Sequence, residues 1–169
     1  MAVKIILHYA SEADLPSVLD VERSMKEILG MSPRECDVDV ERICASAHKT
    51  PYYLMEFCQT KCDVRGVILG RQPAASATID ANTSEPVVTY LVDGKDSPSK
   101  IYSSLDVPSG VGCMTAPPWS EAMALALLKI AGVKDSGLKV LIGKYQKKNR
   151  EKIEATNNKY RCADLKDLL

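Results

Sequence analysis

The sequence predicts an α/β protein in which helices cover both faces of a doubly wound parallel sheet of about five strands. Short apolar, β-branched runs alternate with segments of helical periodicity along the chain, and this alternation is typical of a parallel sheet with crossover helices. The connections are short, so successive units are expected to pack side by side. An amphipathic helix at the C-terminal end completes the expected three-layer αβα architecture.

The first strand and helix are the most clearly marked. Val3–Tyr9 is an apolar, β-branched run, and apolar residues then follow at helical spacing through Asp14–Leu29. Asp14 is expected to cap this helix, with Pro16 in its first turn, because both residue types favour helix starts. Gly30 is expected to end it.

The next two units follow the same order. Cys36–Cys44 alternates polar and apolar residues, as a less buried strand would, and Pro51–Lys61 returns to helical periodicity. Val64–Leu69 is expected to be the third strand, because it is short and mostly apolar. A short helix of small residues is expected at Ala74–Asn82.

The last part of the chain supplies two strands and two helices. Strands are expected at Pro86–Val92 and at Val111–Ala116, on either side of a loop rich in Gly, Asp, Ser and Pro. Trp119–Ala131 is a strongly apolar helix that Gly132 ends. Ser136–Ala155 carries apolar residues on one face and lysines around the rest, so it is expected to be an amphipathic helix.

Composition excludes several classes of protein. The chain has 169 residues and 46% hydrophobic content, which predicts a single domain over residues 1–169. Its 22 basic residues balance 22 acidic ones, so neither nucleic acid nor a membrane surface is an expected partner. No secretory signal or membrane-spanning run is recognised, which favours a cytoplasmic protein. Six cysteines without CxxC pairs favour reduced thiols, and no metal site is predicted.

The clearest chemical signal is the segment Ser46-Ala47-His48-Lys49, followed by Thr50-Pro51. It comes directly after the second expected strand, and ligands of doubly wound folds bind at the carboxyl ends of strands. A hydroxyl from Ser46, the ammonium of Lys49 and the guanidinium of Arg71 after the third strand could bind one anion. His48 could then transfer a proton near neutral pH. The residues alone leave another interpretation open, in which His48 caps the next helix and Lys49 is solvated.

Two further residues have open interpretations. His8, the other histidine of the chain, could line the same crevice or could be packed at the end of its strand. Cys113 follows Gly110-Val111-Gly112 and could be a nucleophile, although a buried cysteine without a chemical role is the more common case. The familiar glycine-rich nucleotide loops and the GxSxG elbow are absent from the sequence.

Three blocks of the sequence resemble the aminoimidazole ribonucleotide (AIR) carboxylase, or PurE, family. Residues 46–51 resemble its SAH[KR]xP segment. Gly70-Arg71 with the later Asn82-Thr83 and Pro86-Val87-Val88 resembles its GRSN…NTxxPVI segment, and residues 101–113 resemble the SSLRxPSGxGC stretch of the branch that uses carbon dioxide directly. The resemblance extends over about residues 3–169 and implies a flavodoxin-like domain.

The resemblance implies a reaction and its residues. The imidazole carbon of AIR would attack carbon dioxide and then lose its proton to give 4-carboxy-AIR, in purine biosynthesis, without a cofactor or metal. His48 would shuttle the proton, and Ser46, Lys49 and Arg71 would contact the substrate. Ser11 and Asp14 correspond to the serine and aspartate of the family's GSxSD turn. The partners implied are the ribonucleotide, carbon dioxide and further copies of the chain, as a tetramer or an octamer. The apolar helix Trp119–Ala131 and the final amphipathic helix could supply an interface between these copies, or they could only cover the sheet.

Two hypotheses of different classes follow. The first is a divergent AIR carboxylase, a carboxy-lyase that retains the chemistry of His48. The second is a noncatalytic relative that serves as a ligand-binding or structural subunit. The second is suggested by two altered turns, since residues 8–14 replace the glycine of GSxSD and Gln72-Pro73 replaces the end of GRSN.

Overall fold

The computed structural model describes residues 2–46, 58–69, 74–92 and 109–160. Across these residues it contains a five-stranded sheet in which all pairs are parallel and the strand order is β2-β1-β3-β4-β5. The strands are β1 (Val3–Tyr9), β2 (Val38–Cys44), β3 (Val64–Leu69), β4 (Val87–Leu91) and β5 (Met114–Ala116). This is the flavodoxin-like order. The predicted doubly wound sheet is confirmed.

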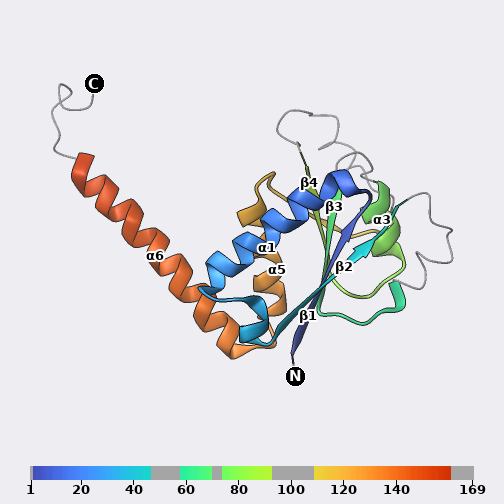
Figure 1. Ribbon diagram of the computed structural model, residues 1–169, viewed down its shortest axis with the longest axis horizontal. Coiled ribbons are helices and arrows are strands. Elements are labelled where there is room, and N and C mark those ends of the chain that lie inside the picture. Colours follow the sequence, from blue (N-terminus) through green and yellow to red (C-terminus); the bar gives the residue numbers. More distant parts are fainter. Residues whose placement is uncertain (1, 47–57, 70–73, 93–108, 161–169) are drawn as a thin grey trace.

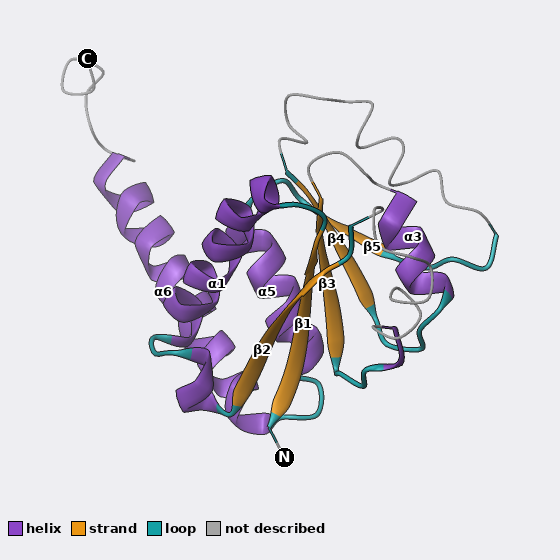
Figure 2. Ribbon diagram, turned by 45° about the vertical axis from the view of Figure 1, so that its right-hand side comes forward, coloured by secondary structure: helices purple, strands orange, loops and turns teal. Residues whose placement is uncertain are grey.

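Helices cover both faces of the sheet, as Figures 1 and 2 show. One face carries α1 (Leu15–Leu29) and α5 (Ser120–Ala131), against which α6 (Ser136–Tyr160) packs. The opposite face carries α3 (Ala74–Ala81). The two faces bury separate apolar clusters, a large one under α1 and α5 and a smaller one that includes Cys58, Val67 and Ile79.

Alternation along each strand decides which side chains reach which face. In β3, Val64 and Ile68 join the large cluster, whereas Val67 joins the small one. Gly66 lies on the side of α5, where an added Cβ would be 2.8 Å from Leu7 Cδ2 and 2.9 Å from Met123 Cε. The absence of a side chain there lets α5 lie close to the sheet.

Several predicted boundaries are corrected by the structure. The second strand begins at Val38 rather than Cys36, because Pro33–Cys36 forms a short 3-10 helix and Asp37 turns the chain with a φ of 55°. The fourth strand is shorter than predicted by one residue at each end, and the fifth consists only of Met114–Ala116. Both strands are shorter than predicted because the residues that flank them form turns and loops instead of pairing with a neighbouring strand.

The helix ends also differ in part. Gly30 ends α1 as predicted, with a φ of 73° and its N–H on the carbonyl of Lys26. The short helix after β3 ends at Ala81, and the amphipathic helix continues to Tyr160 rather than Ala155. Of the predicted helix Pro51–Lys61, residues 51–57 lie outside the described residues, and the helical turn at Cys58 and Gln59 ends before Lys61. In the described ranges, no helix is long and apolar enough to cross a membrane.

Candidate functional site

The candidate site lies at the carboxyl edge of the sheet, beside β1. In this strand order the connections leave β1 and β3 in opposite directions, and ligands of such folds bind at that switch point. Tyr9 at the end of β1 is paired with Cys44 of β2 on one side and with Ile68 of β3 on the other. The segments that follow β1, β2 and β3 therefore start from neighbouring positions.

Asp14 organises the turn after β1. Its Oδ2 accepts hydrogen bonds from the backbone N–H of Ala10 at 3.1 Å and of Ser11 at 3.0 Å, and from Ser11 Oγ at 3.3 Å. The N–H of Asp14 in turn donates to the carbonyl of Ser11 at 3.0 Å. Asp14 is buried, whereas Ser11 is exposed. Asp14 stands at the N-cap position of α1 as predicted, but its side chain caps the preceding 3-10 turn instead of α1.

Ser46 follows β2 at the same edge. The N–H of Ala45 donates to the carbonyl of Tyr9 at 2.6 Å, and Cys44 Sγ is 3.8 Å from the carbonyl of Ala10. These contacts join the end of β2 to the start of the turn that holds Ser11 and Asp14. Ser46 itself is half-buried. The structure thus brings three predicted site residues to adjacent strand ends.

The other predicted residues, His48, Lys49 and Arg71, lie outside the described residues. Their part in the site stays a prediction that rests on the sequence. Residues 46 and 69, which immediately precede the two segments that contain them, are both described and both lie at the carboxyl edge.

Tyr9 and Glu12 are two residues in which the first turn differs from the GSxSD pattern, and the structure shows where each side chain lies. Tyr9 packs against the large apolar cluster with α1, so its ring occupies the core side of the sheet. Glu12 is exposed in the short 3-10 helix Glu12–Asp14. The turn therefore has a regular, hydrogen-bonded structure without the glycine of the GSxSD pattern.

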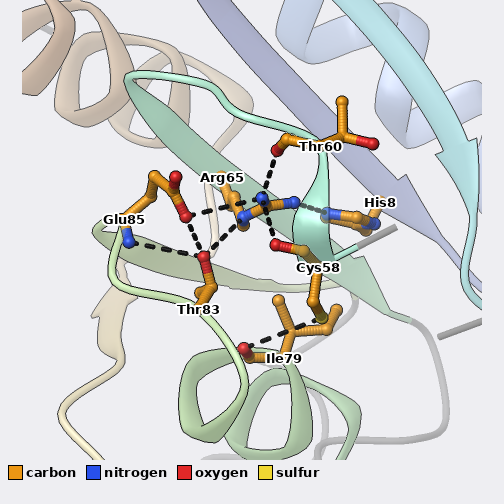
Figure 3. A network of polar contacts seen from close by, with 7 residues as sticks. All are labelled: His8, Cys58, Thr60, Arg65, Ile79, Thr83 and Glu85. Carbon is orange, nitrogen blue, oxygen red and sulfur yellow. Dashed lines mark hydrogen bonds and ion pairs between the residues drawn. The ribbon is translucent and has the colours of Figure 1, made fainter. Parts of the chain in front are cut away.

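A buried polar network toward the amino ends of β3 and β4 was not found by sequence reasoning. Arg65 is completely buried on the face of β3 that α3 covers, and its guanidinium contacts three separate segments (Figure 3). Nη1 lies 3.4 Å from His8 Nε2, and Nη2 donates to the carbonyls of Cys58 at 3.1 Å and Thr60 at 2.5 Å. The signal in the sequence was a charged residue inside an otherwise apolar strand.

The third segment in this network is the connection between α3 and β4. Arg65 Nε donates to Thr83 Oγ1 at 3.2 Å, and Nη2 lies 3.5 Å from Glu85 Oε2. Thr83 Oγ1 also donates to the carboxylate of Glu85. Burial acts to raise the pKa of Glu85, but the hydrogen bond from Thr83 and the charge of Arg65 outweigh it, so the pKa is lowered.

The sequence left open whether His8 lines the crevice or is packed at the end of its strand, and the structure shows that it is packed. It is 1% exposed, and burial together with the charge of Arg65 lowers the pKa of its imidazole to about 3. His8 is therefore neutral at physiological pH. Its Nδ1 has no hydrogen-bond partner in the structure described.

The cysteines show no sign of a reactive or metal-binding role where they are described. Cys113 is half-buried and packs against the small apolar cluster. Burial raises the pKa of Cys62 to about 11, so that thiol is protonated at neutral pH. Among the described residues, no three His, Cys, Asp or Glu side chains are grouped to hold a metal ion.

Comparison with known proteins agrees with this architecture. The family model described as AIR carboxylase matches residues 3–152. A phosphoribosylaminoimidazole carboxylase of Archaeoglobus fulgidus is 36% identical over 73% of this chain and 71% of its own length. An N5-carboxyaminoimidazole ribonucleotide mutase of Pyrococcus horikoshii is 28% identical over 85% of this chain and 81% of its own.

The fold comparison gives the same result. A crystal structure of Treponema denticola PurE superposes with a TM-score of 0.78, covering 93% of this chain and 98% of that one at 20% identity. Its likeness supports the flavodoxin-like sheet and the placement of the helices. With the family model matched over most of its length, the chain belongs to the AIR carboxylase family, a family of carboxy-lyases.

Proposed function

We propose that this protein is a phosphoribosylaminoimidazole carboxylase of purine biosynthesis that interconverts AIR and 4-carboxy-AIR with carbon dioxide. The observation that carries the proposal is the juxtaposition at the carboxyl edge of the sheet. Ser46, two residues before His48, follows β2 beside the turn in which Asp14 holds Ser11. This is the position that a doubly wound fold offers to a ligand.

In the carboxylation direction, an electron pair of the imidazole ring forms the bond from its carbon to the carbon of carbon dioxide. The ring carbon then carries both a proton and the new carboxylate, and aromaticity returns when the proton leaves to His48. In the reverse direction His48 protonates that carbon, and carbon dioxide leaves with cleavage of the bond. An imidazole with a pKa near 6.5 can serve in both directions near neutral pH.

Substrate binding is assigned to residues of three strand ends. Ser11 and Ser46 offer hydroxyl groups to the ribose and phosphate, and Asp14 offers its carboxylate to the ribose. Lys49 and Arg71 offer cations to the phosphate or the new carboxylate. Hydrogen bonds between ionised partners are stronger than those between neutral ones, which suits an anionic nucleotide. No cofactor or metal is assigned to the reaction.

Decarboxylation of 4-carboxy-AIR tests this function. We expect turnover by the wild-type chain and a loss of about 10²–10⁴-fold in kcat for His48→Asn, the range typical of a general acid or base. Lys134→Gln, at an exposed position between α5 and α6, is the control and should retain the wild-type rate. Turnover that is unchanged in His48→Asn would contradict the role of His48.

The alternative is a noncatalytic ligand-binding or structural subunit of the same fold. The altered turns at residues 8–14 and 72–73 favour it. It predicts binding of the nucleotide in calorimetry without any turnover in either direction, so the same samples distinguish the two functions.

We further propose that the chain acts as a cytoplasmic homo-oligomer, a tetramer or an octamer, built from a single domain over residues 1–169. Support comes from exposed apolar side chains at Trp119, Val140 and Ile153. The last turns of α6 extend away from the sheet (Figure 1), and isolated helical segments are only marginally stable in water. Sedimentation at the 18.5 kDa mass of one chain would contradict this assembly.

A further inference from the structure

The buried guanidinium of Arg65 joins three segments that are distant in sequence. It reaches the end of β1 through His8, the helical turn at Cys58–Gln59 through the carbonyls of Cys58 and Thr60, and the α3–β4 connection through Thr83. Figure 3 shows these groups converging on Arg65 from different elements. A guanidinium offers five N–H donors in a planar fork, so one side chain can hold all of these acceptors.

Two of the anchored segments are the ends of stretches that contain predicted site residues. The chain from Ser46 to Cys58 includes His48 and Lys49, and the chain from Leu69 to Thr83 includes Arg71 and α3. Each stretch starts at the carboxyl edge of the sheet and, at its other end, reaches a residue bonded to Arg65. A cation beside the last carbonyls of a helical turn is also favourable for the helix dipole.

The contact with His8 fixes the protonation of its ring. A guanidinium can only donate, so the facing Nε2 must be unprotonated and the proton must be on Nδ1. The low pKa of the buried ring is consistent with this neutral form. His8 precedes Tyr9, whose carbonyl accepts the N–H of Ala45, so this histidine is adjacent to the junction between the first turn and the end of β2.

We propose that Arg65 is a positioning residue for the reaction assigned above, which sets the geometry of the site indirectly by holding His8, the 58–60 segment and the α3–β4 connection in one arrangement. The inference rests on the proposed carboxylase function. Arg65 does not touch the substrate. A displacement of about 1 Å at a reacting group can cost about 10²-fold in rate. A residue that holds the segments around the site can therefore change kcat without contacting the substrate.

The test compares the activity of folded variants in which buried side chains are substituted on opposite faces of the sheet. Arg65→Met removes every donor, Arg65→Lys keeps the charge without the fork, and Leu127→Ala truncates a buried side chain on the opposite face of the sheet. All are assayed well below their melting temperatures. We expect kcat to fall about 10²-fold in Arg65→Met and to recover only in part in Arg65→Lys, while Leu127→Ala keeps the wild-type kcat. Equal kcat in Arg65→Met and Leu127→Ala would overturn the proposal.

A spectroscopic measurement follows the same contact directly. The chain has two histidines, so ring-labelled His48→Asn protein gives the nitrogen signals of His8 alone. We expect the Nδ1–H tautomer at pH 7, changed in Arg65→Met. An Nε2–H tautomer or a charged ring in the presence of Arg65 would overturn the proposal.

If Arg65→Met does not fold, Thr83→Val removes one acceptor of Arg65 while it preserves side-chain shape, and its kcat should fall with an unchanged KM. A wild-type kcat in Thr83→Val would then overturn the proposal. A wild-type chain without turnover would contradict the carboxylase function itself. A wild-type chain with turnover, whose kcat does not change when Arg65 is substituted, would contradict only the positioning role of Arg65.

Discussion

Single residues determine how the candidate site is built, and Asp14 shows this most clearly. Its buried carboxylate accepts two backbone N–H groups and the hydroxyl of Ser11, so it holds the turn after β1 in place. The resemblance to the GSxSD turn predicted both residues, but it could not show that the aspartate bonds within its own turn. That knowledge requires the backbone path from Ala10 to Asp14, which the residue types alone do not determine.

The buried imidazole of His8 gives the free energy of unfolding a defined pH dependence. Its pKa is about 3 in the folded chain and 6.5 for an ordinary histidine, so between these values the unfolded chain binds the additional proton. Stability should therefore fall as pH is lowered from 6.5 toward 3, by up to about 1.4 kcal/mol per pH unit. Below pH 3 both states are protonated and this contribution ends.

Urea unfolding of the wild type and of His8→Met between pH 6.5 and pH 5 measures this slope. In that window Glu85, whose pKa is lowered from an ordinary value of 4.5, is mostly ionised in both states and contributes less than His8. Any titration of His48 is common to the two proteins and cancels. Parallel pH dependence in both proteins would show that His8 is not buried in its neutral form.

At the scale of elements, periodicity and helix-end residues predicted the order of strands and helices. Gly30 ends α1 because a positive φ is needed there. The prediction failed where local hydrogen bonds compete with a strand: Ser32 and Glu35 form a capping box around Pro33–Cys36 and delay β2 to Val38. That serine and glutamate, three residues apart, are a recognisable start signal, so this boundary was predictable in principle.

The contact between β3 and α5 depends on Gly66. A methyl group in Gly66→Ala would be 2.8 Å from Leu7 Cδ2 and 3.1 Å from Leu127 Cδ1, so buried side chains must shift. We expect a loss of about 1–3 kcal/mol in the free energy of unfolding, as for other overpacked cores.

Gly143→Ala is the matched control, because nothing lies within 4 Å of an added Cβ at this position in α6. It should raise stability by up to about 1 kcal/mol through helix propensity. Chemical denaturation of both variants checks the pair. Equal stability changes would mean that α5 does not approach the sheet as closely as the structure shows.

For the whole molecule, the sequence predicted the fold, because the fold follows from alternation and chain order. The same reasoning predicts the edge of the sheet at which a ligand binds. It did not predict the network of polar contacts around Arg65. His8 and Arg65 are separated by 57 positions, and their contact depends on register and on which face each side chain occupies. A charged residue in a short apolar strand indicates a buried polar group, but the sequence does not show which residue that group contacts.

The central claim is that the chain joins carbon dioxide to AIR. The most direct measurement supplies AIR and isotopically labelled carbon dioxide without ATP and follows the label into 4-carboxy-AIR. The claim predicts labelled product from the wild-type chain and loss of that product in His48→Asn. Formation of 4-carboxy-AIR from N5-carboxyaminoimidazole ribonucleotide alone, with no label incorporated from carbon dioxide, would contradict it.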